Sequence, residues 1–204
     1  MVSDAYTVRP RYFSFIIRHF GVRPTVDAFA SGSNHVCPRW WGEGSPWGAD
    51  AFAHSWGGQG TLWLNPPFDL MSPVLAKVRE DQAHAIFVMP DWGVKAWHSD
   101  ALRMRRADIL FPTGSKFFLR DGNLCQGTRW DTRVVLLCGH TPKCPDQSTT
   151  TFVSYRERHV VTFDLTPHLH FIAPLPHDAL GAYEGGRCRV IHFMGAMSQI
   201  VAQF

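Results

Sequence analysis

The chain has 204 residues, of which 45% are hydrophobic and 18% are charged, a composition typical of one globular domain and not of a disordered chain. The formal net charge is +3, which permits binding to a phosphate backbone without demonstrating it. No apolar run approaches the roughly 18 residues that span a bilayer, and the five cysteines are an odd number without a C-x-x-C pair, which argues against a secreted disulfide framework and a zinc ribbon.

The N-terminal third is predicted to hold one helix, one strand and a long aromatic loop. Apolar residues at helical spacing predict a helix over 11–20, which Gly21 ends. Residues 24–30 are typical of a strand, and 31–34 have turn chemistry. Residues 35–58 form an irregular stretch with four tryptophans. A loop of this length inside a domain is usually functional or disordered, and its aromatic residues argue against disorder.

Strands and helices then alternate as far as residue 138. Ser72 and Pro73 form a helix start, with Ser72 as the cap and Pro73 at the first helical position. Such alternation with short apolar strands predicts a mainly parallel sheet covered by helices. We expect strands at 61–64, 84–89 (stopped by Pro90), 107–111, 117–119 and 132–138, and helices at 72–82 and 94–104.

The domain boundary is expected at residue 139. Residues 1–139 are predicted to form the α/β domain, and 140–204 an irregular C-terminal extension of unassigned role with one strand candidate at 159–163. The spacing of the cysteines and histidines in this extension matches no standard structural zinc site, so no metal is expected. The side chains in question are Cys144, His168, His170, His177 and Cys188.

The residues Asn65-Pro66-Pro67-Phe68 follow an apolar strand and suit the methylation of an exocyclic amino group. The lone pair of such a nitrogen is delocalised into its ring, so the nitrogen is a poor nucleophile. The side-chain carbonyl of Asn65 and the backbone carbonyl of Pro66 offer acceptors for both amino hydrogens. The prolines stiffen the turn, and Phe68 offers a face for a flipped base. The alternative is a simple strand-ending turn.

The chain resembles the phage-type DNA N6-adenine methyltransferases (Dam-like) and the related methyltransferase-like domain of retroelements that integrate with a tyrosine recombinase (DIRS-type). The resemblance covers about residues 12–139 and depends on several pieces in order. These pieces are Val26-Asp-Ala-Phe-Ala-Ser31, Asn34, Cys37-Pro38-Arg39, Gly48-Ala-Asp50-Ala-Phe52, Ser55-Trp56, Leu62-Trp-Leu-Asn-Pro-Pro-Phe68, Val88-Met-Pro-Asp-Trp92 and Trp97-His98.

This resemblance implies a Rossmann-like fold that binds S-adenosylmethionine. By analogy, Asp27, Ala28, Phe29 and Ala30 would line the methionine end of the cofactor, and Asp50 would lie near the cofactor or the target base. Asn65, Pro66, Pro67 and Phe68 would be catalytic. In such retroelements the domain often follows a reverse transcriptase and a ribonuclease H, so association with a reverse transcriptase is a further expectation.

Two departures and three alternatives qualify these assignments. No G-x-G loop follows the first strand, and Phe68 replaces the tyrosine common in the phage enzymes. Asp27 also fits a turn cap, and Asp50 fits an Asx turn. Arg39 and Trp92 are the candidates for contact with nucleic acid, although Arg39 also fits a structural contact to the tryptophan-rich loop.

The function expected from the sequence is S-adenosylmethionine-dependent methylation of DNA, with adenine N6 as the favoured target. The alternative is a catalytically inactive, retroelement-derived domain that binds nucleic acid. The start of the chain lacks the pattern of a signal peptide, so an intracellular protein is expected, in the cytoplasm or nucleus. Adenine versus cytosine, DNA versus RNA, the target sequence and the oligomeric state stay open.

Overall fold

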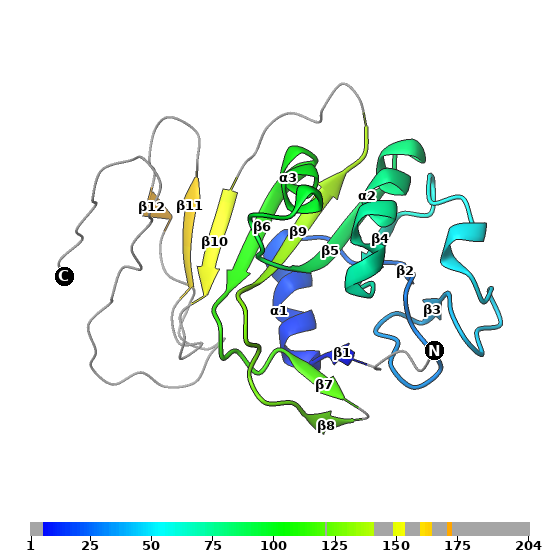
Figure 1. Cartoon of the computed structure of the whole chain (residues 1–204), viewed down its shortest axis with the longest axis horizontal. Helices are drawn as coiled ribbons and strands as arrows, with labels where there is room; N and C mark the ends of the chain where they lie inside the picture. Colours follow the sequence, from blue (N-terminus) through cyan, green and yellow to red (C-terminus); the bar gives the residue numbers. More distant parts are fainter. Residues whose placement is uncertain (1–5, 121, 141–148, 154–159, 165–170, 173–204) are drawn as a thin grey trace.

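The computed structural model describes residues 6–120, 122–140, 149–153, 160–164 and 171–172. A nine-stranded sheet runs through the described residues in the order β12-β11-β10-β6-β9-β5-β4-β2-β3. Helices α2 and α3 lie on one face of this sheet and α1 on the other (Figure 1). A second, three-stranded sheet of order β1-β7-β8 lies beyond the strand ends of the first, where β6 ends (Figure 1).

The elements of the N-terminal half are short apart from two helices. The strands are β1 Tyr6–Val8, β2 Val26–Asp27, β3 Arg39–Trp40 and β4 Thr61–Leu64; the helices are α1 Pro10–Phe20, the 3-10 turns η1 Ala51–Ala53 and η2 Phe68–Leu70, and α2 Met71–Glu80.

The second half contributes the longest strands. The strands are β5 His84–Pro90, β6 Arg105–Phe111, β7 Phe118–Arg120, β8 Asn123–Leu124, β9 Thr132–Cys138, β10 Thr149–Val153, β11 Val160–Asp164 and β12 Phe171–Ile172; the helix α3 spans Ala96–Arg103.

Strand directions give the sheet a mostly parallel character. The strands β3, β2, β4 and β5 pair in parallel, and so do β6 and β10. β9 lies between β5 and β6 and is antiparallel to both, and β11 is antiparallel to β10 and β12. Seven of the nine strands therefore run the same way.

Two hydrophobic cores cover the two faces of the sheet, because successive side chains of a strand point to opposite faces. In β5, Phe87 and Met89 join the core beneath α2 and α3. Ile86 and Val88, from the same strand, join the core that contains Tyr12 and Ile16 of α1. This double burial explains why β5 and β9 are nearly continuous apolar runs.

The fold expected from the sequence is confirmed: the protein has a Rossmann-like α/β sheet covered by helices. The helix ended by Gly21 is present, and Gly21 takes the left-handed conformation at its C-cap. The expected strand 61–64 is β4, and 132–138 is β9. Antiparallel β9 is the exception to the parallel pattern, which a run of apolar residues alone does not reveal.

Several boundaries differ from expectation. Helix α2 begins at Met71 behind the turn η2, and no side chain caps it, so the assignment of Ser72 as its cap is wrong. Strand β2 is shorter than the expected 24–30. Beyond Asp27 the backbone makes hydrogen bonds to two different segments: Ala28 N donates to Trp63 O, and Ala30 N donates to Trp41 O. Pro90 closes β5 as its last residue.

The described part of residues 140–204 adds strands to the same sheet. β10 pairs in parallel with β6, and β11 pairs with β10 over the expected strand 159–163. The histidines and cysteines weighed as a zinc set lie outside the described residues. Within the described ranges, no group of His, Cys, Asp or Glu side chains has metal-binding geometry, and no helix is long and apolar enough to cross a membrane.

Candidate active site

The candidate site lies at the carboxyl edge of three adjacent parallel strands. Asn65 follows β4, Asp27 ends β2, and Asp91 follows β5. The register pairs Asp27 with Trp63 and Leu64 with Phe87, so the ends of these strands lie side by side. Ligands of open parallel sheets bind at this edge.

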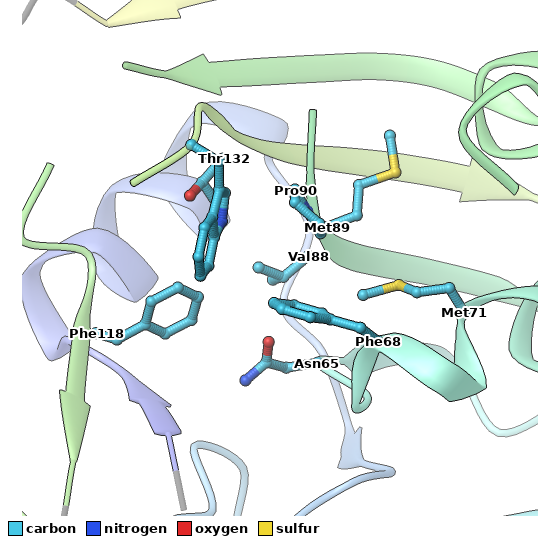
Figure 2. Close-up of a pocket in the computed structure, with 9 residues that line it drawn as sticks. Asn65, Phe68, Met71, Val88, Met89, Pro90, Phe118 and Thr132 are labelled. Carbon is cyan, nitrogen blue, oxygen red and sulfur yellow. The ribbon is translucent and has the colours of Figure 1, made fainter. Parts of the chain in front are cut away.

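Asn65 has its amide group oriented by the backbone of β1. Its Nδ2 donates to the carbonyl oxygen of Tyr6 at 3.2 Å, and since only the NH2 end of an amide donates, Oδ1 is the free acceptor end. Figure 2 shows this oxygen directed between the rings of Phe68 and Phe118. The Asn65 side chain therefore presents an acceptor to the hollow in front of it.

The two prolines divide their roles. Pro66 is buried and Pro67 is exposed. The Pro67 carbonyl accepts from Leu70 N at 3.0 Å and so closes the turn η2. Among the described residues, no hydrogen bond to the Pro66 carbonyl is present.

Aromatic and apolar side chains form the walls of a small pocket at Asn65 (Figure 2). Phe68 is 48% exposed, and its ring lies edge-to-face against Trp92 (5.1 Å between centroids) and Trp130 (5.5 Å). This group, Phe68, Trp92 and Trp130, is called the aromatic trio below. The pocket is lined by Asn65, Phe68, Met71, Val88, Met89, Pro90, Phe118, Trp130 and Thr132.

Trp130 and Phe118 are site residues that the sequence did not single out. Trp130 comes 65 positions after Asn65 in the chain, and it reaches the pocket because Thr132 pairs with Pro90 at the start of antiparallel β9. Phe118 arrives through β7, which pairs with β1. Neither pairing leaves a local pattern in the sequence.

Asp27 is a buried carboxyl group with an unsatisfied oxygen. It is 3% exposed, and Oδ2 accepts from Val36 N at 3.0 Å while Oδ1 has no partner among the described residues. Burial raises the pKa of Asp27 to about 7, against the lowering by the backbone N–H groups of Val36 and Phe29. An orphaned acceptor of this kind is the expected partner of a cationic donor.

The other residues expected at the cofactor have mainly packing contacts. Ala28 and Ala30 are buried, and Phe29 packs against Phe52 and Trp56 at 5.8 and 6.1 Å between ring centroids. Asp50 is exposed, and its side chain accepts from Phe52 N at 2.9 Å as the N-cap of η1. That contact is the Asx-type turn weighed as the alternative for Asp50.

The two residues expected to contact nucleic acid are separated. Trp92 belongs to the aromatic trio, beside Phe68. Arg39 lies on β3, at the far edge of the sheet beyond β2, where its guanidinium lies 5.8 Å from the ring centre of Trp41. The structure thus brings Asn65, Phe68, Trp92 and Asp27 to one edge, whereas Arg39 has the structural contact weighed as its alternative.

A buried charge network holds the turn that precedes Trp92. Asp91 Oδ1 accepts from His98 Nε2 at 2.6 Å and from Arg133 Nε at 2.7 Å. Arg133 continues to Asp108, which also accepts from Thr150. Burial alone would raise the pKa of Asp91, but the hydrogen bonds and charges of Arg133 and His98 outweigh it and hold this pKa below its usual range.

The mostly parallel sheet flanked by helices is consistent with a Rossmann-like methyltransferase fold. The family model described as DNA N-6-adenine-methyltransferase (Dam) matches residues 2–157. The chain therefore belongs to the Dam family of DNA N6-adenine methyltransferases. Comparisons with curated proteins and with solved structures give no match.

Proposed function

We propose that this protein transfers a methyl group from S-adenosylmethionine to the N6 amino group of adenine in DNA. The observation that supports this most directly is the Asn65 Oδ1 acceptor, which faces an aromatic-walled pocket at the carboxyl edge of β4. Membership of the Dam family gives the reaction class. We further propose that this chain is catalytically active, that S-adenosylmethionine is its cofactor, and that the residues named below carry out the reaction.

In the proposed mechanism Asn65 and Pro66 hold the amino group. Asn65 Oδ1 accepts one N6 hydrogen, and the Pro66 carbonyl accepts the other. Both bonds draw the nitrogen out of conjugation with the ring, so its lone pair becomes available for attack. The hydrogen bond from Asn65 Nδ2 to Tyr6 O fixes the amide before substrate arrives, and such preorganisation avoids a reorganisation cost during the reaction.

Phe68 positions the base in this account. An adenine inside a duplex is stacked, so it must leave the helix before its amino group reaches Asn65. Phe68 is the exposed ring beside Asn65, and stacking of a base on an aromatic side chain is worth about 1–3 kcal/mol. The apolar walls of Met71, Val88 and Met89 exclude water from the amino group.

The residues at the end of β2 fit S-adenosylmethionine. Asp27 has a buried, unpartnered oxygen, and the cofactor's ammonium group is a cation that would satisfy it. Ala28 and Ala30 are small residues directly beyond β2, and both are buried. When bound, the cofactor supplies an electrophilic methyl group on its sulfonium; Asp27 supplies binding and orientation only.

The retroelement context stays a prediction. Association with a reverse transcriptase, and the alternative of an inactive nucleic-acid-binding domain, rest on the resemblance alone. The unpaired Asp27 oxygen and the oriented amide of Asn65 favour the enzyme, because an inactive fold needs neither. Assignment of Asp50 and Arg39 to the cofactor and to DNA is likewise a proposal that awaits variants.

Two variants of Asn65 test the mechanism. Asn65→Ala removes the acceptor, and we expect kcat to fall about 100- to 1000-fold, as for the loss of one preorganised hydrogen bond to a reacting group. Asn65→Asp keeps an acceptor oxygen but loses the donor to Tyr6. Its kcat should therefore lie between that of the wild type and that of Asn65→Ala. Steady-state transfer of labelled methyl groups to DNA measures both, with cofactor affinity as the control for folding.

Turnover of Asn65→Ala at the wild-type rate would overturn this mechanism. Equal rates for the two variants would show that the acceptor oxygen at this position is not what the reaction uses.

A further inference from the structure

We propose that the three-stranded sheet β1-β7-β8 and its flanking residues form the surface that holds duplex DNA beside the pocket. This surface, called the basic sheet below, comprises Arg9, Arg11, Lys116, Arg120 and Arg129 with the strands between them. The inference rests on the proposed function, because it assigns the substrate's phosphates to a face of the same site.

The basic sheet is joined to the candidate active site by direct contacts. Tyr6 of β1 accepts the hydrogen bond from Asn65 at its carbonyl. Phe118 of β7 lines the pocket, and its ring lies 5.9 Å from that of Tyr6. Figure 1 shows β1, β7 and β8 beyond the edge of the main sheet where β6 ends. A molecule on this sheet would therefore lie next to Asn65.

The five cationic residues gather around these strands. Arg9 Nη1 donates to Lys116 O at 3.0 Å, and Arg9 N donates to Phe117 O, so the start of α1 and the start of β7 lie together. Arg120 lies opposite Tyr6 in the strand register. Arg11, Lys116, Arg120 and Arg129 are exposed.

Arg129 connects the basic sheet to the aromatic trio. It stands between Thr128 and Trp130 in the chain, and Thr128 is fixed by backbone bonds to Ser115 and Gly114 at 3.1 and 2.8 Å. Trp130 lines the pocket, so the backbone of the exposed residue Arg129 is directly adjacent in the chain to a pocket residue. A phosphate held there would be close to a base held at Phe68.

The positive charge of the chain is concentrated in these segments. Residues 6–20 and 112–131 contain two Asp residues and six Lys and Arg residues, which are the five of the basic sheet and Arg18 at the end of α1. That is a formal charge of +4, against +3 for the whole chain. The remainder of the molecule is close to neutral, so the basic sheet is the region toward which a polyanion would be steered.

Duplex DNA is the polyanion that fits best. Lys and Arg side chains bind phosphate oxygens and fix the register of a duplex, while base contacts are made elsewhere. The exposed apolar side chains Tyr6 and Leu124 on the same sheet (40% and 51% exposed) suit contact with sugars at a groove. The pocket beside the sheet is small and mostly apolar, which does not suit a phosphate chain.

Fluorescence anisotropy with a labelled 20-base-pair duplex tests the inference. The double variant Lys116→Ala/Arg129→Ala removes two charges of the basic sheet, and the matched control Arg79→Ala/Arg103→Ala removes two exposed charges over α2 and α3. If both residues contact phosphates, affinity near 0.1 M salt should fall about tenfold or more. The slope of log K against log salt should shrink by roughly 1.8, since each contact contributes about 0.9.

The charge-conserving variant Lys116→Arg/Arg129→Lys should keep near wild-type affinity. The proposal is overturned if the two double alanine variants lose affinity equally, or if Lys116→Ala/Arg129→Ala loses none. It is also overturned if the wild type does not bind the duplex, or binds a single strand more tightly than the duplex.

A methyl-transfer assay separates this proposal from the proposed function. If only the Lys116→Ala/Arg129→Ala variant loses duplex binding and the wild type transfers no methyl group, the basic sheet is supported as the DNA surface and the proposed enzyme is refuted. Methyl transfer by the wild type, with an unchanged KM for DNA in the Lys116→Ala/Arg129→Ala variant, supports the proposed enzyme and refutes the basic sheet as the DNA surface.

Discussion

Phe68 is the residue whose exposure is hardest to explain without a ligand. Large aromatic side chains are usually buried, because each removes a large apolar area from water, yet Phe68 is 48% exposed at the rim of an apolar pocket. In the proposed mechanism the target base covers it.

Replacing Phe68 tests this stacking role. We expect Phe68→Leu to lower kcat/KM for DNA about ten- to a hundredfold, which corresponds to the roughly 1–3 kcal/mol of one base–aromatic stack. Phe68→Tyr should stay close to wild type because stacking needs only the ring. Steady-state kinetics on duplex DNA measures both, and Val94→Ala, at an exposed apolar position, serves as the control. Full activity of the leucine variant would refute stacking at this position.

Asp27 is expected to make the stability of the protein depend on pH. Burial raises the pKa of this carboxyl to about 7 in the folded protein, from 3.8. The folded state therefore holds the proton more tightly than the unfolded chain, so the contribution of Asp27 to stability decreases as pH rises from about 4 to about 7 and is level above that. Neighbouring Cys37 stays neutral, because burial raises its pKa to about 12.

The same titration should appear in cofactor binding. At pH 6 Asp27 is mostly protonated and cannot pair with an ammonium group, so we expect the affinity of the wild type for S-adenosylmethionine to rise between pH 6 and pH 8. Asp27→Asn should bind more weakly at pH 8 and lose most of this rise. Isothermal titration calorimetry at several pH values measures the effect. The same pH profile in both proteins would remove Asp27 from the cofactor site.

The local part of the site was predictable from the sequence. Asn65 and Asp27 each lie at the end of a strand, and the ends of parallel strands share one edge of a sheet, so their proximity follows from pattern alone. Trp130 and Phe118 were not predictable, because antiparallel β9 and the pairing of β1 with β7 bring them in from distant positions. The role of Asp50 was evenly balanced in the sequence, and its cap on η1 now accounts for one of its contacts.

At the scale of elements, the turn between β5 and α3 depends on the network around Asp91. Arg133 lies between Asp91 and Asp108 within the sheet, and His98 reaches Asp91 from α3. Trp92 follows directly, and Trp92 N donates to Pro90 O at 3.0 Å. The network thus fixes the turn that leads into Trp92, one ring of the aromatic trio.

Asp91→Asn should therefore weaken both stability and the site. Loss of one partner of a buried ion pair costs about 3–5 kcal/mol, and since Arg133 keeps Asp108 we expect the lower end of that range. Chemical denaturation measures it, with Asp100→Asn, whose ion pair with Arg103 is exposed, as a control expected to cost at most about 1 kcal/mol. Equal stability of the two variants would show that the network contributes little.

Element prediction succeeded where apolar residues are continuous. β4, β5 and β9 were located from their apolar runs, and α1 from its periodicity and Gly21. Ser72 failed as a cap because the turn η2 leads directly into α2 and supplies the helix start from the backbone. β1, β3 and β10 have no distinctive pattern of their own, since they exist through pairing with β7, β2 and β6.

The whole molecule combines two sheets with different partners. The large sheet brings Asp27, Asn65 and Trp92 to one edge, and the small sheet fixes the Asn65 amide and concentrates positive charge beside it. The sequence predicted the large sheet and the family resemblance over 12–139, and the Dam family match spans 2–157. It predicted β7 at 117–119 but not β1, β8 or their pairing into a small sheet, because strands of two or three residues leave too little pattern.

The most direct test of the central claim is the product of the reaction. Unmethylated genomic-length duplex DNA is incubated with the protein and S-adenosylmethionine, digested to nucleosides and analysed by mass spectrometry. The account predicts N6-methyladenine with the wild type and a loss of about 100-fold or more with Asn65→Ala. The absence of any methylated base, or the appearance of N4-methylcytosine in its place, would contradict the proposal of adenine N6 methylation at Asn65.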